Sequence, residues 1–190
     1  MKLNKNTFEI IFFARAGQGA KTAAEIVAQA AMNEGKNIQA FPFYGPERSG
    51  APTKAYVRIS SEPIRQHEPV TDPDLVVVLD ETLLASQDVS NNLDRDESLI
   101  INTNRSVEEV RNEVSKFQGA IHPIDALGLG LKITGSPAIN SVILGKLVKV
   151  SEIVKLESVI SEFRELFEKK IGKELTEKNI KAIQEGYDCI

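Results

Sequence analysis

The chain has 190 residues, of which 42% are hydrophobic and 26% are charged, a composition that excludes an intrinsically disordered protein. Its formal net charge of −4 gives no electrostatic basis for general nucleic-acid binding. The single cysteine, Cys189, cannot form an internal disulfide, and it cannot hold an iron–sulfur cluster, which needs about four thiolates. We expect a cytoplasmic protein without a signal peptide or a membrane association, because no apolar run approaches the roughly 20 residues of a span.

Apolar and alternating patterns predict strands at residues 8–14, 37–43, 53–59, 75–79, 99–102 and 120–125. The strand at 8–14 is apolar on both faces, which is typical of a central strand in a sheet. The strand at 53–59 alternates, with Lys54, Tyr56 and Arg58 on one face. That alternation indicates one solvated face, so we expect this strand to be antiparallel or to lie at an edge.

Helical patterns are predicted at 20–35, at 81–89, from Ser106 onward, and at 137–148, 151–170 and 176–186. Ser106 and Glu109 form a capping-box pattern, and Ser136 is a candidate N-cap. Strands that alternate with helices predict a three-layer α/β/α sandwich with a mixed, mostly parallel central sheet. We expect one domain over residues 1–190, with a C-terminal helical segment at about 151–190.

A glycine-rich turn, Ala14-Arg15-Ala16-Gly17-Gln18-Gly19-Ala20-Lys21-Thr22, separates the first strand from the first helix. Phosphate-binding loops occur at such positions, because amides at a helix N-terminus favour anions. The turn matches neither the Walker A pattern nor the dinucleotide fingerprint G-x-G-x-x-G.

Three interpretations of this turn remain open. The glycines could only permit a tight bend, the turn could contact a partner subunit, or its amides could bind an anion with the help of basic side chains. For the third interpretation, the candidate ligand-binding residues are Arg15, Gly17, Gln18, Gly19, Lys21 and Thr22.

The segment Phe41-Pro42-Phe43-Tyr44-Gly45-Pro46-Glu47-Arg48-Ser49-Gly50-Ala51-Pro52 combines three prolines with three aromatic residues. Prolines fix φ and remove amide donors, so we expect a stiff loop that forms an interface or the wall of a pocket. The candidate interface residues are Phe43, Tyr44, Gly45, Pro46, Glu47, Arg48, Ser49 and Gly50. The alternative is that Phe41 and Phe43 are core residues at a strand end.

The sequence shows no set of residues with the types and spacing of a known catalytic site. His67 and His122 are the only histidines, neither has the spacing of a metal ligand, and no nucleophile–base pair or metal cage is evident. Asp80 follows a buried strand, where α/β folds place sites, although a structural role is favoured. We predict no catalytic residue and no metal site in this chain.

Both segments resemble the gamma subunit, or gamma domain, of the pyruvate and related 2-oxoacid:ferredoxin oxidoreductases. The turn is similar to that family's Gly-x-Gly-Gly-Gln-Gly, with Ala14 and Ala16 in place of two glycines, and the proline-rich segment is similar to the family loop. The resemblance continues at 57–59, 63–64, 72–80, 140–145 and 186–187. The amino-acid sequence of the turn is similar to that of the pyruvate and branched-chain group of this family.

This resemblance implies an oxidative decarboxylation of a 2-oxoacid to an acyl-CoA, with electrons passed to ferredoxin or flavodoxin. It implies partner alpha, beta and ferredoxin-like delta subunits, which carry thiamine diphosphate, Mg²⁺ and the iron–sulfur clusters. The gamma-type subunit packs on the thiamine-containing core, and coenzyme A at the glycine-rich turn is a hypothesis. The alternatives are a purely structural assembly subunit and a stand-alone nucleotide-binding module.

Overall fold

The computed structural model describes residues 6–44 and 50–189, apart from the side chain of Tyr44. A six-stranded sheet has the order β2-β3-β1-β4-β5-β6. Only β3 runs against the other strands, since it pairs antiparallel with both β1 and β2, whereas β1, β4, β5 and β6 pair in parallel. The predicted fold class, with a mixed and mostly parallel sheet, is confirmed. The strands are β1 Thr7–Arg15, β2 Asn37–Tyr44, β3 Pro52–Ser60, β4 Leu75–Val78, β5 Ser98–Asn102 and β6 Ala120–Ile124.

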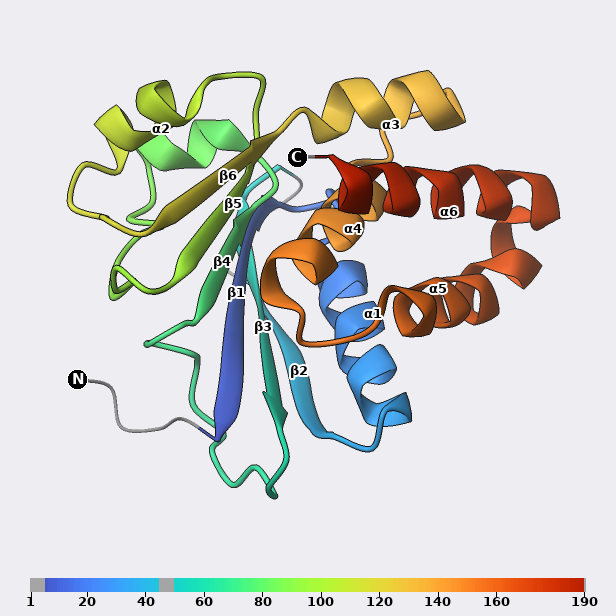
Figure 1. Cartoon of the computed structure of the whole chain (residues 1–190), viewed down its shortest axis with the longest axis horizontal. Helices are drawn as coiled ribbons and strands as arrows, with labels where there is room; N and C mark the ends of the chain where they lie inside the picture. The colour runs from blue at the N-terminus through green and yellow to red at the C-terminus, as the bar shows by residue number, and fades with distance from the viewer. Residues whose placement is uncertain (1–5, 45–49, 190) are drawn as a thin grey trace.

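Helices cover both faces of the sheet, and one layer is much thicker than the other (Figure 1). The thick layer contains α1, α4, α5 and α6, whereas η1 and α2 form the thin layer. The helices are α1 Ala20–Asn33, η1 Glu81–Ala85, α2 Val107–Glu113, α3 Ala126–Thr134, α4 Ile139–Ser151, α5 Leu156–Ile171 and α6 Lys173–Asp188.

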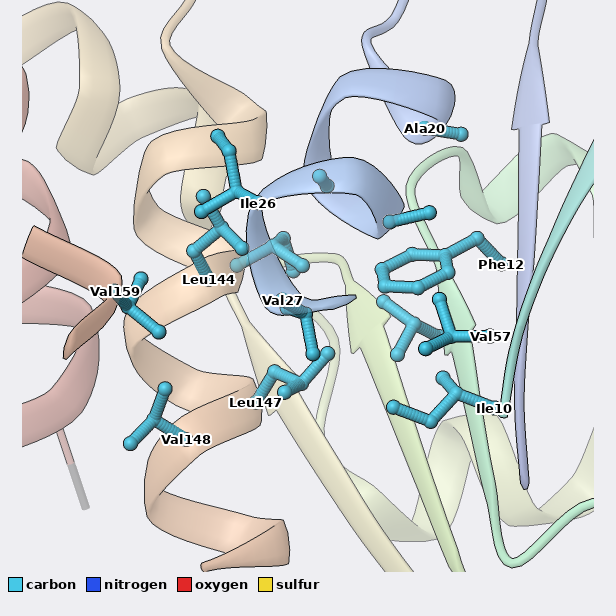
Figure 2. Close-up of a cluster of buried hydrophobic side chains, with 14 of the residues drawn as sticks. Ile10, Phe12, Ala20, Ile26, Val27, Val57, Leu144, Leu147, Val148 and Val159 are labelled. Atoms are coloured by element: carbon cyan, nitrogen blue, oxygen red, sulfur yellow. The ribbon is translucent and has the colours of Figure 1, made fainter. Parts of the chain in front are cut away.

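The larger core lies between the sheet and the thick helical layer. Figure 2 shows Ile10 and Phe12 of β1 facing Val27 of α1, with Leu144 and Leu147 of α4 behind them. The sheet-facing side of α1 is built largely from alanines, so this helix packs close to the strands. The predicted central position of the first strand is confirmed, because β1 lies between β3 and β4 and its apolar residues are buried on both faces.

The prediction of a solvated face on β3 was wrong, although its antiparallel direction is confirmed. β3 lies between β2 and β1, and its residues from Ala55 to Ser60 are buried. Arg58 is only 2% exposed, and its guanidinium bonds to three partners. Its Nε lies 2.7 Å from Oε1 of Glu9, and its Nη1 donates to Oε1 of Gln39 and to the carbonyl of Glu68, each at 2.8 Å. The strand register places Glu9, Arg58 and Gln39 in one row across three strands.

Several helix boundaries differ from the prediction. The segment predicted as a helix at 81–89 is a short 3-10 helix that ends at Ala85. Helix α3 was not predicted, because Gly128 and Gly130 interrupt its apolar pattern. Ser136 does not cap α4, whose N-cap is Ala138 without a side-chain hydrogen bond. The capping box of Ser106 and Glu109 is confirmed.

The bounds of the three C-terminal helices also differ from the predicted ones. Helix α4 continues to Ser151, where Glu152 takes a left-handed conformation, and α5 then covers Leu156–Ile171. Helix α6 is longer than expected, at 16 residues. Within the described residues, no single helix is long and apolar enough to cross a membrane; α3 and α4 satisfy length and composition only as a pair, bent by 118°.

Candidate functional site

The glycine-rich turn joins the end of β1 to the start of α1. Gly17 and Gly19 have φ values of +99° and +82°, a left-handed region that side chains rarely adopt, so glycine is required at both positions. The turn is closed by a bond from the Gln18 amide to the Arg15 carbonyl at 3.1 Å. The Ala16 amide donates to the Ala51 carbonyl at 2.9 Å, which ties the turn to the far end of the proline-rich segment.

Two helices begin next to each other at this turn. Gly19 is the N-cap of α1, and a Cβ there would lie 3.0 Å from Nδ2 of Asn140, in the first turn of α4. Neither helix has a side-chain cap or an acidic residue in its first turn. Each helix therefore presents the positive end of its dipole and has no N-cap side chain on its first amides, although in α4 the Ser141 amide donates to Oδ1 of Asn140 at 3.0 Å. This arrangement favours an anion beside Gly19 and Asn140.

A hydrogen-bonded cluster connects the turn to the end of β4. Arg15 donates through Nη2 to Oγ1 of Thr82 at 2.8 Å and through Nη1 to the Gly50 carbonyl at 3.1 Å, and its Nε lies 3.4 Å from Oδ2 of Asp80. Gln18 accepts from the Arg15 amide at 2.8 Å and donates to Oδ2 of Asp80 at 2.7 Å. Asp80 also caps η1 by accepting from the Thr82 amide at 3.0 Å. The cluster fixes the positions of the glycine-rich turn and of Gly50 on the sheet.

The pKa of Asp80 lies below its ordinary value. Burial alone would raise this pKa, but hydrogen bonds from Thr82 and Gln18 and the charge of Arg15 outweigh burial. The folded state therefore prefers the carboxylate. The resulting stability is fully present above the unfolded pKa of about 3.9 and is lost as the pH falls through the lower folded pKa.

Asp80→Asn is expected to lower the free energy of unfolding by about 1–3 kcal/mol at pH 7, because the amide places a donor against Gln18 and Arg15. The difference from the unsubstituted chain should shrink as the pH falls below about 4, because the unfolded chain then binds a proton at Asp80 before the folded chain does. Urea unfolding at pH 7 and pH 3 measures both values. The exposed Asp88→Asn is the matched control, and an equal difference at both pH values would rule out the carboxylate as the cause.

The structure brings together only part of the predicted ligand-binding set. Arg15 is committed to Asp80, Thr82 and Gly50 and therefore has a structural role in the turn. Lys21 is about half exposed, and its ammonium lies 3.5 Å from Glu25, one helical turn farther along α1. Thr22 is half-buried in the first turn of the helix.

Sequence reasoning missed Thr82 and Asn140 as members of this region. Asp80 carried a detectable signal, since it directly follows a buried strand. Thr82 had none, because its contact with Arg15 depends on β4 lying beside β1 in the sheet. Asn140 was noted only as part of a resemblance, and its position over Gly19 depends on the packing of α4 against α1.

The predicted interface residues are only partly described. Phe43 is 52% exposed near the end of β2, whereas Phe41 is half-buried and packs on Tyr56 at 5.2 Å between ring centroids. The core alternative is therefore supported for Phe41 and contradicted for Phe43. Gly50 has a φ of +86°, and Tyr44 ends β2. The other predicted interface residues, Gly45, Pro46, Glu47, Arg48 and Ser49, lie outside the described residues.

In the described part of the chain, no group of three or more histidine, cysteine, aspartate or glutamate residues could hold a metal ion. His67 is exposed, and His122 is half-buried on β6. Burial, followed by the charge of Lys146, lowers the pKa of His122, so its imidazole is predominantly neutral at pH 7.

The family model for pyruvate ferredoxin/flavodoxin oxidoreductase matches residues 9–189. The chain belongs to this family. It is 46% identical to the protein named pyruvate/ketoisovalerate oxidoreductases common subunit gamma of Thermococcus kodakarensis, with 95% of each chain covered. Within the family, it is a subunit of the gamma type.

Solved structures agree with this assignment. The crystal structure of the pyruvate oxidoreductase subunit PORC from Thermotoga maritima is similar, with a TM-score of 0.87, 40% identity and 97% coverage of both chains. A 2-oxoglutarate:ferredoxin oxidoreductase from Magnetococcus marinus shares the fold alone, with a TM-score of 0.78 and 19% identity. This chain covers 32% of that longer chain.

Proposed function

We propose that this chain is the gamma-type subunit of a multisubunit 2-oxoacid:ferredoxin oxidoreductase that acts on pyruvate or a branched-chain 2-oxoacid. The observation that carries the proposal is the near full-length similarity to a relative named as a subunit common to pyruvate and ketoisovalerate oxidoreductases. The reaction is the oxidative decarboxylation of the 2-oxoacid to an acyl-CoA. The acceptor of the complex is ferredoxin or flavodoxin, and the complex is cytoplasmic.

In this proposal, the catalytic chemistry takes place on other subunits. The alpha, beta and ferredoxin-like delta subunits hold thiamine diphosphate, Mg²⁺ and the iron–sulfur clusters. The single cysteine of this chain supports that division, because a cluster needs about four thiolates. This subunit packs on the thiamine-containing core, and the exposed Phe43 beside the proline-rich segment supports a contact there.

The proposed role at the coenzyme A site rests on the two uncapped helix N-termini beside Gly19 and Asn140. A phosphate group of coenzyme A is an anion that such amides bind well. Lys21 lies in the first turn of α1, and its partner Glu25 forms only an exposed pair at 3.5 Å. Exposed pairs of this kind contribute little, so Lys21 is available to a phosphate.

Lys21→Ala is expected to raise the KM of the assembled complex for coenzyme A about threefold to tenfold, with the KM for the 2-oxoacid unchanged. Lys178→Ala is the matched control, because Lys178 also forms an exposed i,i+4 pair with a glutamate, on α6. Arg15→Ala is not a clean test, since Arg15 holds the turn in place. An unchanged KM for coenzyme A in the Lys21 variant would remove this part of the proposal.

Purification of the tagged chain from its native cells tests the subunit assignment. We expect brown material that contains iron, thiamine diphosphate and larger co-purifying chains. A colourless monomer that binds a nucleotide would instead indicate a stand-alone nucleotide-binding module. Assembly defects in turn variants would indicate a purely structural subunit, whereas a raised KM for coenzyme A in an intact complex would indicate a ligand role.

A further inference from the structure

A cavity of about 220 Å³ lies on the face of the sheet that carries η1 and α2. Its apolar wall comes from Phe13 of β1, Val70 and Val89, and its polar wall from Lys54 and Tyr56 of β3. At about 30 Å³ per liquid water, the volume corresponds to roughly seven waters. That space suits a small organic group and is below the size of most cofactor sites.

A hydrogen bond joins the two loops that enclose this cavity. Asn92 donates through Nδ2 to the Thr71 carbonyl at 2.7 Å, which joins the loop before β4 to the loop after η1. Asn92 adopts a left-handed conformation with a φ of 64°, which asparagine tolerates better than most other residues. This bond between the two loops helps to hold the walls of the cavity in place.

Two polar groups in the cavity have unused hydrogen-bonding capacity. The Lys54 ammonium lies 4.6 Å from the centroid of the Phe13 ring and forms no hydrogen bond or ion pair with any described residue. Tyr56 is only 5% exposed, and its hydroxyl likewise has no hydrogen-bond partner among residues 6–44 and 50–189. Neither atom is among the buried side-chain atoms of the described residues that lack a partner, so both reach solvent and can exchange water for a ligand in the cavity.

We propose that this cavity binds a carboxylate on a short apolar stem, with Lys54 and Tyr56 donating hydrogen bonds to the carboxylate and with Phe13, Val70 and Val89 contacting the stem. An ammonium and a hydroxyl on one wall match the two oxygens of a carboxylate. Asp88 is exposed at the rim and forms no ion pair with Lys54 in the described structure, so the ammonium is left for an incoming anion.

The solvation of the two polar groups supports this assignment. Burial lowers the pKa of the Lys54 ammonium and raises the pKa of the Tyr56 hydroxyl. Both groups are therefore partly desolvated, and a hydrogen bond from either to a carboxylate is stronger than in bulk water. The carboxylate could belong to a free small acid or to an acidic side chain of a partner subunit, and the chemistry is the same for both.

The test is an NMR titration of the full-length chain with isobutyrate. We expect saturable shifts in β1, β3 and the two enclosing loops, and about tenfold or greater weakening in Lys54→Met, because a charge-assisted hydrogen bond is lost. Tyr56→Phe should weaken binding severalfold, the neutral isobutyramide should bind weakly, and Lys178→Met should bind normally. The Tyr56 variant decides the matter if Lys54→Met fails to fold.

The absence of saturable shifts, or equal affinity in the Lys54 variant, would overturn the proposal and leave a cavity that holds only water. The same titration on the assembled complex separates the two sources of the carboxylate. Binding that persists in the complex indicates a free acid, whereas binding that the complex blocks indicates a partner's side chain. The titration of the free chain does not depend on the subunit assignment, so each can fail without the other.

Discussion

Arg58→Met is expected to lower the free energy of unfolding by about 3–5 kcal/mol, because it removes the buried cation that lies 2.7 Å from the carboxylate of Glu9. Arg58 is 2% exposed, and its side chain also bonds to Gln39 and to the Glu68 carbonyl. Its removal therefore affects β1, β2 and the loop that covers the sheet. Urea unfolding of the purified chain at pH 7 measures the loss.

A double variant separates the effect of the lost ion pair from the loss of packing. Glu9→Leu combined with Arg58→Met should be more stable than Arg58→Met alone, since replacement of both charges by apolar groups is often close to neutral. Arg164→Met is the control, because Arg164 forms an exposed pair with Glu177 and should change stability by less than about 1 kcal/mol. A loss below about 1 kcal/mol in Arg58→Met would contradict the role given to this row.

Gly145→Ala is expected to lower the free energy of unfolding by about 3 kcal/mol, even though alanine is the better helix former. Helices α4 and α6 cross here with their backbones in contact. A Cβ on Gly145 would lie 1.8 Å from the Ile183 carbonyl oxygen, and a Cβ on Gly186 would lie 2.0 Å from that of Val142. Backbone atoms cannot rotate away as a side chain can, so the two helices must separate.

Gly186→Ala should have an effect of similar size, because the two glycines face the same crossing from opposite helices. The neighbouring Glu185→Ala, on the exposed side of α6, should change stability by less than about 0.5 kcal/mol. Thermal unfolding followed by circular dichroism compares all three variants. A melting temperature for Gly145→Ala equal to that of Glu185→Ala would contradict the close crossing.

These two sites show what the sequence could and could not predict. The strand and helix pattern sufficed for the fold class, because buried strands such as Leu75–Val78 carry an unbroken apolar run. The alternation at β3 was misinterpreted, since the charge of Arg58 was assigned to solvent. Its partner Glu9 lies 49 residues away in the chain, and only the strand register shows that the two face each other.

The candidate site was likewise predictable from the sequence only in part. The left-handed turn at Gly17 and Gly19 was predictable, because glycines between a strand and a helix favour such a bend. The ion pair of Arg15 with Asp80 and its hydrogen bond to Thr82 were not predictable, since they depend on which strand lies beside β1. The uncapped starts of α1 and α4 also required the structure, because Ser136 offered a cap that the fold does not use.

Recombination of the purified subunits tests the central claim most directly, namely that this chain contributes to 2-oxoacid oxidation only as part of a complex. The measurement is coenzyme A-dependent reduction of ferredoxin with pyruvate or 2-oxoisovalerate as the substrate. We predict no turnover by this chain alone, little by its partner subunits without it, and full activity when they are recombined. Turnover by the isolated chain, or undiminished activity of the partners without it, would contradict this account.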